Sequence, residues 1–186
     1  MDRQGLEAFL GQLTIRDIDA NLVPLRPNWA QSQIIDEYVA ARNESRPFRA
    51  IVCKSRQLGV STLMQALLFC EAFWGENANC AVVAHERESS EELFAKQRMF
   101  YEMHPFKEHY PHKYASRRQL VLEKQRSSVW VTTSENPHAG RSRTINHCHI
   151  SEIGFWKQPE TTMLSLNQTI PNRPGTTVLI ESTPNG

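Results

Sequence analysis

The alternation of apolar and polar stretches is clearest between residues 50 and 74, where a polar loop separates two apolar segments. Residues 50–53 (AIVC) form a short apolar run of the kind that a buried strand makes. From Leu63 onwards, apolar side chains recur at helical spacing, which predicts a helix packed on a sheet. The residues between them, KSRQLGVST at 54–62, therefore join the end of a strand to the start of a helix.

The same two periodicities continue along the rest of the chain. Apolar runs predict strands at 80–85, 145–150 and 177–180, and a hairpin with arms at 120–122 and 129–131. Helical spacing predicts helices near the N-terminus (Leu6, Phe9, Leu10, Leu13), at 29–38, at about 90–103 and at 159–166. Strands that alternate with helices indicate an α/β fold, with a mainly parallel sheet and right-handed crossovers.

The start of the helix near residue 90 has a sequence signal of its own. Ser89 and Glu92 have the spacing of a capping box, in which a serine side chain and a glutamate three residues later satisfy the first backbone N–H groups. This pattern places the first helical turn at about Ser90.

Composition narrows the class of protein only a little. The chain has 186 residues and a formal net charge of +1, which suits one domain and gives no overall signal for nucleic acid. The stretch 105–118 is locally basic and suits a polyanion, although a solvated loop is the commoner explanation.

Four scattered cysteines without a C-x-x-C pair are typical of reduced, buried thiols in a cytosolic protein. No signal peptide is apparent, and no run approaches membrane-spanning length.

The polar loop has the chemistry of a phosphate-binding loop. A strand–loop–helix junction directs backbone N–H groups and the positive end of the helix dipole at one point. Gly59 permits a close backbone approach, and Ser61 stands where such loops place a hydroxyl for magnesium. Lys54 and Val60, however, replace the glycine and lysine of the G-x-x-x-x-G-K-[ST] pattern, so the phosphate cation is expected from Lys54 or Arg56. The alternative is an ordinary connection with a solvated basic loop.

Two further polar groups follow predicted strands. Glu152 lies at the end of the 145–150 strand, and Ser182 with Thr183 follows the last strand. Ligands of open α/β sheets bind at the carboxyl ends of the strands. A nucleotide hydrolase needs a phosphate cradle, a carboxylate that orients water, and a sensor of the γ-phosphate. These segments together supply that set.

Two other candidates are weaker on the residues alone. Gln31 begins the 29–38 helix, and its amide has the donor and acceptor needed to read adenine, but a surface glutamine is the simpler interpretation. His147 and His149 share one face of a strand without a further cluster of ligands, so a metal site is not favoured there.

Three segments, KSRQLGVST, HISEIGFW and ESTPNG, resemble the large terminase subunit of tailed double-stranded DNA viruses, the ATPase that packages genomes into capsids. The resemblance runs from Gln31 to Gly186, with the motifs in the family's order and spacing. It implies a P-loop NTPase of the ASCE type, a three-layer sandwich whose mainly parallel sheet is flanked by helices. It also implies a segment at 1–48 on the adenine side and an ATPase core at 49–186, which ends after the coupling motif and lacks the family's nuclease domain.

The resemblance gives each motif a role. Gln31 would read adenine, and Glu152 would be the catalytic carboxylate at the end of the Walker B strand. Ser182 and Thr183 would form the coupling motif that links hydrolysis to movement. A deviant Walker A would bind ATP, with Lys54 and Arg56 sharing the phosphate charge, through Lys54, Ser55, Arg56, Gln57, Leu58, Gly59, Val60, Ser61 and Thr62.

The metal and the trans-acting cation follow from the same resemblance. Mg²⁺ would depend on Ser61 and on Glu152 or water, because Ser151 stands where many ATPases have the magnesium-ordering aspartate. Arg141 would reach the phosphate of a neighbouring subunit, with Arg143 as the second candidate.

The implied partners are double-stranded DNA, the viral portal protein and the small terminase subunit. The subunits would be monomeric in isolation and form a homo-oligomeric ring on the capsid. They would occur in the host cytoplasm and transiently at the procapsid portal, without a membrane.

Two other functions fit parts of the pattern. A superfamily-2-like helicase or translocase has related motifs, but residues 151–154 (SEIG) lack its D-E-x-[DH] box. A non-catalytic assembly module would bind portal or DNA through a P-loop relic, yet the joint presence of Ser61, Glu152 and Ser182 argues against such decay.

Overall fold

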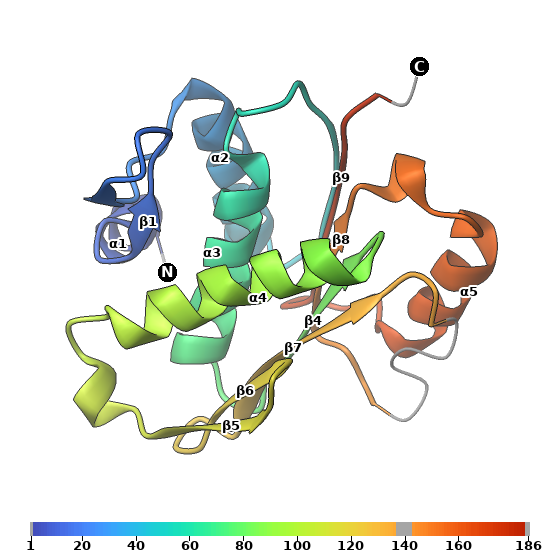
Figure 1. Cartoon of the computed structure of the whole chain (residues 1–186). Coiled ribbons are helices and arrows are strands. Elements are labelled where there is room, and N and C mark those ends of the chain that lie inside the picture. Colours follow the sequence, from blue (N-terminus) through green and yellow to red (C-terminus); the bar gives the residue numbers. More distant parts are fainter. Residues whose placement is uncertain (1, 137–142, 185–186) are drawn as a thin grey trace.

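The computed structural model describes residues 2–136 and 143–184. Their main feature is a seven-stranded sheet with the order β3-β9-β8-β4-β7-β6-β5 (Figure 1). Its strands are β3 (Phe48–Cys53), β4 (Asn79–Ala84), β5 (His112–Ser116), β6 (Gln119–Leu122), β7 (Ser127–Thr133), β8 (His147–Ser151) and β9 (Thr177–Ser182). The pairs from β3 to β7 are parallel, whereas the β7–β6 and β6–β5 pairs at one edge are antiparallel. The predicted α/β fold with a mainly parallel sheet is confirmed.

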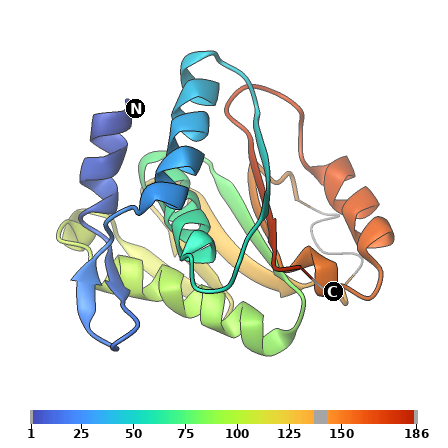
Figure 2. The same cartoon turned by 90° about the horizontal axis from the view of Figure 1, so that it is seen from above.

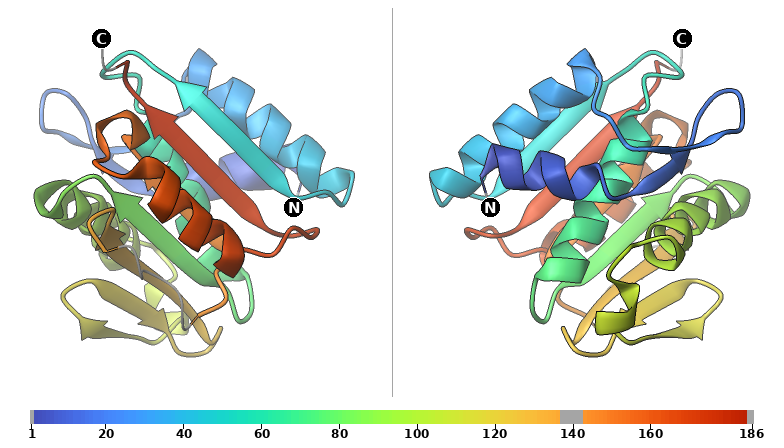
Figure 3. Two further views of the ribbon diagram at one scale, coloured as in Figure 1. Left: turned by 90° about the vertical axis from the view of Figure 1, so that its right-hand side faces the viewer. Right: turned by 90° about the vertical axis from the view of Figure 1, so that its left-hand side faces the viewer.

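Helices cover both faces of this sheet. One face carries α1 (Arg3–Leu10), α2 (Trp29–Asn43), α3 (Val60–Trp74) and α4 (Arg87–Glu102), and the other carries α5 (Pro159–Thr169), as Figures 2 and 3 show. The apolar core divides in the same way, into a large cluster under α1–α4 and a smaller one between the sheet and α5. The result is the three-layer sandwich that the sequence predicts.

The helix α3 lies at the centre of the larger core. It is apolar around most of its circumference, and its side chains from Leu63 to Phe69 are buried. Such a helix needs cover on every side. The N-terminal segment supplies part of that cover, because Phe9 of α1 packs against Phe69 and Phe73. The helix whose first turn follows the 54–59 segment is thereby anchored in the core.

The predicted start of the helix near residue 90 was wrong. The helix α4 begins at Arg87, with Glu86 as its N-cap, so Ser89 and Glu92 form no capping box. The Ser89 hydroxyl instead donates to the Glu86 side chain, and that of Ser90 donates to the Arg87 carbonyl. These hydroxyls bond back to the preceding turn, which serines inside a helix can do.

The basic stretch at 105–118 is not simply a loop. It contains the short 3₁₀ helix η1 (Lys107–His109) and β5, which pairs with β6 and extends the predicted hairpin to a third strand. A second addition is the small antiparallel sheet of β1 (Thr14–Arg16) and β2 (Leu22–Pro24), which lies between α1 and α2 in the sequence.

The cysteines also differ from expectation at one position. Cys70, Cys80 and Cys148 are buried, but Cys53 is exposed, and all four are free thiols. Cys53 lies on β3, an edge strand whose outward-facing residues, such as Ile51, are uncovered. No described helix is both long enough and apolar enough to span a membrane.

Candidate functional site

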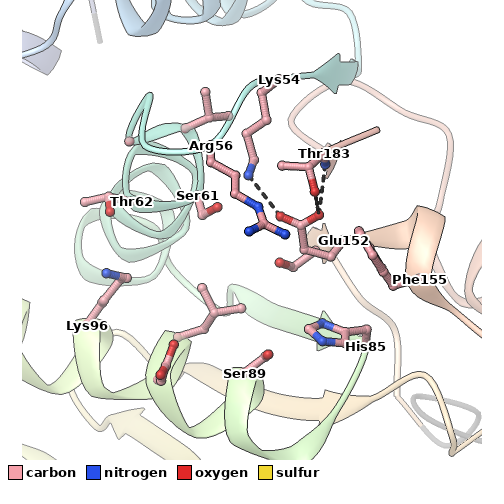
Figure 4. Close-up of a pocket in the computed structure, with 15 residues that line it drawn as sticks. Lys54, Arg56, Ser61, Thr62, His85, Ser89, Lys96, Glu152, Phe155 and Thr183 are labelled. Carbon is pink, nitrogen blue, oxygen red and sulfur yellow. Dashed lines mark hydrogen bonds and ion pairs between the residues drawn. The ribbon is translucent and has the colours of Figure 1, made fainter. Parts of the chain in front are cut away.

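A cavity of about 490 Å³ lies at the carboxyl ends of β3, β4, β8 and β9. Figure 4 shows side chains from the 54–62 loop facing Glu152 and Thr183 across it. The predicted site residues that line it are Lys54, Arg56, Gly59, Val60, Ser61, Thr62, Glu152 and Thr183. The fold therefore brings together three segments that are far apart in sequence.

The opposite wall comes from β4 and α4, which the sequence reasoning did not connect with the site. His85 ends the wall at the β4–α4 junction, and Ser89 and Lys96 reach in from α4 (Figure 4). Burial lowers the pKa of Lys96 from its ordinary value. These residues could have been found from the sequence, because they follow the strand predicted at 80–85, which also ends at this edge of the sheet.

The 54–62 loop is held in place by the start of α2. The side-chain amide of Gln31 donates to the Gly59 carbonyl oxygen at 2.8 Å, and Asn28 Nδ2 donates to that of Leu58 at 3.1 Å. Gly59 has φ +67°, and a Cβ there would lie 2.8 Å from Gln31 Nε2. Glycine is therefore required at this position, both for its backbone conformation and for the close approach of the Gln31 amide.

The predicted role of Gln31 in reading adenine stays a prediction. Its side chain is 4% exposed, and its Oε1 accepts from the Asn28 backbone N–H at 3.0 Å in a capping box. With Nε2 on the Gly59 carbonyl, both ends of the amide have partners within the chain. In this arrangement Gln31 positions the loop. Ser55, Gln57, Leu58 and Ser182, like Gln31, do not line the cavity.

The first turn of α3 opens onto the cavity. Its N-cap, Gly59, has no side chain to satisfy the first backbone N–H groups. Those donors and the positive helix end lie beside Ser61 and Thr62, which line the cavity. An uncapped helix start of this kind is a ready-made site for an anion such as phosphate.

Lys54 and Arg56 differ in their surroundings. Lys54 Nζ lies 3.0 Å from Glu152 Oε1 and 2.9 Å from Glu181 Oε2. Burial alone would lower the pKa of Lys54, but hydrogen bonds to Glu181 and Glu152 outweigh it and raise the pKa, so the ammonium stays charged. Arg56 reaches into the cavity (Figure 4) and forms no ion pair with a described residue. Lys54 thus faces carboxylates, while Arg56 is available to a ligand.

Glu152 occupies a special backbone position directly after β8. Its φ is +52°, in the left-handed region that non-glycine residues adopt at a cost. Its Oε2 accepts from both the backbone N–H and the hydroxyl of Thr183, each at 2.9 Å. Burial alone would raise the pKa of Glu152, but the Thr183 N–H, Lys54 and the Thr183 hydroxyl outweigh it and lower the pKa. The group is therefore a carboxylate at neutral pH, and the predicted coupling segment holds one of its oxygens.

The sequence patterns did not single out Glu181, which lies at the end of an apolar strand, directly before Ser182. Its side chain is fully buried, and its Oε1 accepts from Ser61 Oγ at 2.9 Å and from Ser151 Oγ at 2.8 Å. Burial alone would raise its pKa, but contacts with His149, Lys54 and Ser151 outweigh it and hold the Glu181 pKa at about 2. The sequence feature that could have revealed it is a single acidic residue at the end of an otherwise apolar strand. That strand ends at the same edge of the sheet as the other motifs.

With the geometry in place, the chain can be compared with solved structures. The large terminase of bacteriophage HK97 aligns with a TM-score of 0.76 at 14% identity, over 97% of this chain and 37% of that one. The large terminase ATPase domain of Thermus phage P74-26 aligns with a TM-score of 0.58 at 17% identity, over 87% of this chain and 71% of that one. This chain has the fold of a large terminase ATPase domain.

Other comparisons mark the extent of this likeness. An arginine-to-alanine variant of the P74-26 domain aligns with a TM-score of 0.56 at 18% identity, over 87% of this chain and 72% of that one. No family model and no curated protein matches the sequence. The chain spans little more than a third of the HK97 terminase, so the activity and partners of a whole terminase are matters for proposal.

Two arginines expected to act in trans in a terminase ring remain predictions. Arg141 lies outside the described residues. Arg143 is exposed, and its guanidinium lies over the Trp130 ring, 5.5 Å from the ring centroid. This cation–π contact places the exposed Arg143 side chain beside β7, where it is accessible to another molecule.

The oxygen atoms around Ser61 fit a magnesium ion. Ser61 supplies a hydroxyl, and Glu152 and Glu181 supply two carboxylates against the single ammonium of Lys54. No group of three His, Cys, Asp or Glu side chains among the described residues is arranged to hold a metal. Mg²⁺ does not need one, because it commonly binds through one or two protein oxygens together with phosphate oxygens and water.

Proposed function

We propose that this chain is the ATPase domain of a viral genome-packaging motor, which hydrolyses ATP to drive double-stranded DNA into a procapsid. One observation carries the proposal: an ionised Glu152 and an uncapped helix start face each other across one cavity, in a terminase ATPase fold. This is the arrangement that a hydrolase needs between its water-orienting carboxylate and its phosphate cradle.

In the proposed reaction, the ATP phosphates lie at the start of α3 and Glu152 faces the γ-phosphate. Arg56 approaches the phosphates from the loop, and Lys54 can exchange a carboxylate for a phosphate oxygen, since a lysine presents a flexible point charge. Glu152 then accepts a hydrogen bond from the attacking water and orients it. Mg²⁺, when bound with ATP, would neutralise the charge that develops on the phosphate oxygens.

The proposed link to movement begins at Thr183. Both the N–H and the hydroxyl of Thr183 bond to Glu152 Oε2, so a change of Glu152 on hydrolysis alters the bonds that hold the end of β9. Ser182 adds a second tie, because its hydroxyl accepts from the Gly154 N–H at 3.2 Å, in the turn after Glu152. These contacts support the coupling role that the family resemblance implies.

A basic groove supports the proposed contact with DNA. It has a volume of about 710 Å³ and lies between α4 and the β5–β6 hairpin, with Arg87, Arg98, Arg117 and Arg118 among its lining residues. Three of them form ion pairs with acidic residues of α4: Arg87 and Arg118 lie 2.8 Å and 3.8 Å from Glu91, and Arg98 lies 3.3 Å from Glu102. Such exposed pairs are weak, so these arginines can exchange partners for phosphates of the DNA backbone.

The helix α4 lines both the cavity and the basic groove. Ser89 and Lys96 of α4 face the cavity with Glu152, and Arg87 and Arg98 of α4 line the basic groove. A displacement of α4 on hydrolysis would therefore move the groove. The further partners proposed are the portal protein, the small terminase subunit and other copies in a ring, in the cytoplasm of the infected host and at the procapsid portal.

Nucleotide-dependent stability tests the proposal. ATP with Mg²⁺ at a hundredfold excess over Kd should stabilise the chain by about 2.7 kcal/mol, which a thermal melt detects. Release of phosphate from ATP should accompany this binding. A chain that neither melts at a higher temperature nor releases phosphate would instead be a non-catalytic module that has kept the fold.

A further inference from the structure

The position that holds an aspartate in many ATPases of this fold is occupied by Ser151. Its hydroxyl cannot bring a negative charge to a divalent cation, but it does not stand alone. Ser151 Oγ donates to Glu181 Oε1 at 2.8 Å, across the β8–β9 pair in which Ser151 lies opposite Glu181. The neighbouring strand thus places a carboxylate directly beside the position where the aspartate would be.

The same oxygen of Glu181 also accepts from Ser61. The Ser61 Oγ–Glu181 Oε1 distance is 2.9 Å, and Ser61 lines the cavity while the Glu181 side chain is fully buried behind it. Because the Ser61 proton points at Glu181, the oxygen lone pairs of Ser61 are left for a ligand on the cavity side. Glu181 therefore fixes which way the Ser61 hydroxyl faces.

Two buried amide side chains and a histidine lie on the side of Glu181 that faces away from the cavity. Gln97 Nε2 donates to Gln65 Oε1 at 2.7 Å, which fixes the Gln65 amide so that its Nε2 meets His149 Nδ1 at 2.6 Å. An amide nitrogen only donates, so Nδ1 accepts and the ring proton lies on Nε2, 3.4 Å from Glu181 Oε1. All these side chains are fully buried. The hydrogen bonds from α4 through α3 thus fix the His149 ring, and its Nε2 lies beside the Glu181 carboxylate.

We propose that Glu181 is the positioning carboxylate of a divalent-cation site, in place of the missing aspartate, and that it acts through the Ser61 hydroxyl. This inference rests on the proposed ATPase function. Glu181 and Glu152 place two carboxylates against the single ammonium of Lys54, so the ion-paired groups beside Ser61 leave one negative charge. A divalent cation would be attracted to this charge.

Binding of Mn²⁺ in place of Mg²⁺ tests the assignment without relying on turnover. Electron paramagnetic resonance gives the affinity of Mn²⁺ for the ATP-bound chain, and a second titration gives ATP affinity in EDTA. Glu181→Gln should weaken Mn²⁺ binding by about 10–100-fold, the range seen when groups that orient metal ligands are removed. Its ATP affinity in EDTA should stay close to that of the wild type.

Two further variants separate positioning from simple structural damage. Glu71→Gln removes another shielded carboxylate, at the opposite end of the sheet, and should leave Mn²⁺ affinity unchanged. The double variant Ser151→Asp with Glu181→Ser moves the carboxylate to β8 and should restore much of the Mn²⁺ affinity. If Glu181→Gln does not fold, this double variant provides the test instead.

The outcomes are distinct. Wild-type Mn²⁺ affinity in Glu181→Gln, or a folded exchange variant without recovered Mn²⁺ affinity, would overturn the role of Glu181 and leave ATP binding intact. ATP affinity that is equal with and without Mn²⁺ in the wild type would overturn it too. A wild-type chain that binds no ATP under either condition would instead overturn the proposed function, and this inference with it.

Discussion

Two clusters of charged side chains lie at opposite ends of the central sheet. At the amino ends of β8 and β9, Arg42 forms an ion pair with Glu71 and donates to the Thr177 hydroxyl at 3.2 Å. The Tyr38 hydroxyl bonds to the same Glu71 carboxylate. At the carboxyl ends, Lys54 lies between two carboxylates, with hydroxyl groups from Ser61, Ser151 and Thr183 around them.

The clusters differ in charge balance and in the cation they use. At the amino end one guanidinium meets one carboxylate, and the pair is neutral. At the carboxyl end one ammonium meets two carboxylates, which leaves an excess negative charge. Arginine holds a fixed planar geometry, whereas lysine presents a compact charge on a flexible stem. A neutral arginine pair suits a permanent structural link, and an unbalanced lysine cluster suits a site that accepts another cation and changes partners.

The strongest test of this contrast is Glu152→Gln. Loss of the carboxylate that orients water should reduce ATP turnover by about 10²–10⁴-fold, while ATP binding persists because the phosphate cradle is intact. Steady-state hydrolysis beside a binding titration measures both. Glu123→Gln, a surface carboxylate paired with Lys113, is the matched control. Near-wild-type turnover in Glu152→Gln would remove Glu152 from the reaction.

Glu71→Gln should lower the free energy of unfolding but leave ATP turnover unchanged. Removing one partner of a buried pair costs about 3–5 kcal/mol, and the partial exposure of Arg42 and Glu71 reduces this to about 2–3 kcal/mol of unfolding free energy. Urea unfolding measures the loss. Turnover per folded molecule should be unchanged, and a large drop in turnover would show that the amino-end cluster also takes part in function.

Lys54→Ala should weaken ATP binding by about 1.5–3 kcal/mol, the contribution of a hydrogen bond to a charged group. Val60→Ala, in the same loop but without a charge, should change ATP affinity little. Isothermal titration with each variant provides the comparison. Equal ATP affinity in Lys54→Ala and the wild type would transfer the phosphate contact to Arg56.

A further effect concerns acid stability. The Glu181 pKa of about 2 lies below its ordinary value of 4.5, so the carboxylate contributes stability above about pH 4.5 and loses it as the pH falls towards 2. Between these values one extra proton binds on unfolding, a slope of at most about 1.4 kcal/mol per pH unit. Urea melts from pH 5 to pH 2 should show a shallower fall for Glu181→Gln. An identical fall would indicate that other carboxylates dominate.

Much of the site was predictable because strand ends meet at one edge of a parallel sheet. Lys54, Ser61, Glu152 and Thr183 each follow a recognisable strand or begin a helix, and topology alone brings them together. Glu181 escaped prediction for the opposite reason. It belongs to an apolar strand by position, and its role comes from tertiary contacts with Ser151, Ser61 and Lys54.

Local signals failed where tertiary contacts decide the outcome. The Ser89–Glu92 pattern resembles a helix start, yet α4 begins at Arg87, where the β4 strand has ended and the chain turns back over the sheet. Similarly, β5 becomes a strand because β6 offers it an edge for pairing, although its sequence is that of a polar loop. The contact of Gln31 with Gly59 is likewise a tertiary contact that no sequence pattern indicates, and its predicted role in reading adenine stays a prediction.

The exposure of Cys53 gives this protein a built-in attachment point for a spectroscopic probe. Burial raises the pKa of Cys70 and of Cys148 to about 12 and also raises that of Cys80, so these thiols resist alkylation in the folded state. Cys53 lies at the surface, one residue before Lys54. A maleimide fluorophore should therefore label the native chain at a single place, beside the loop. Changes in its emission would then report in real time when the loop rearranges, without any engineered cysteine.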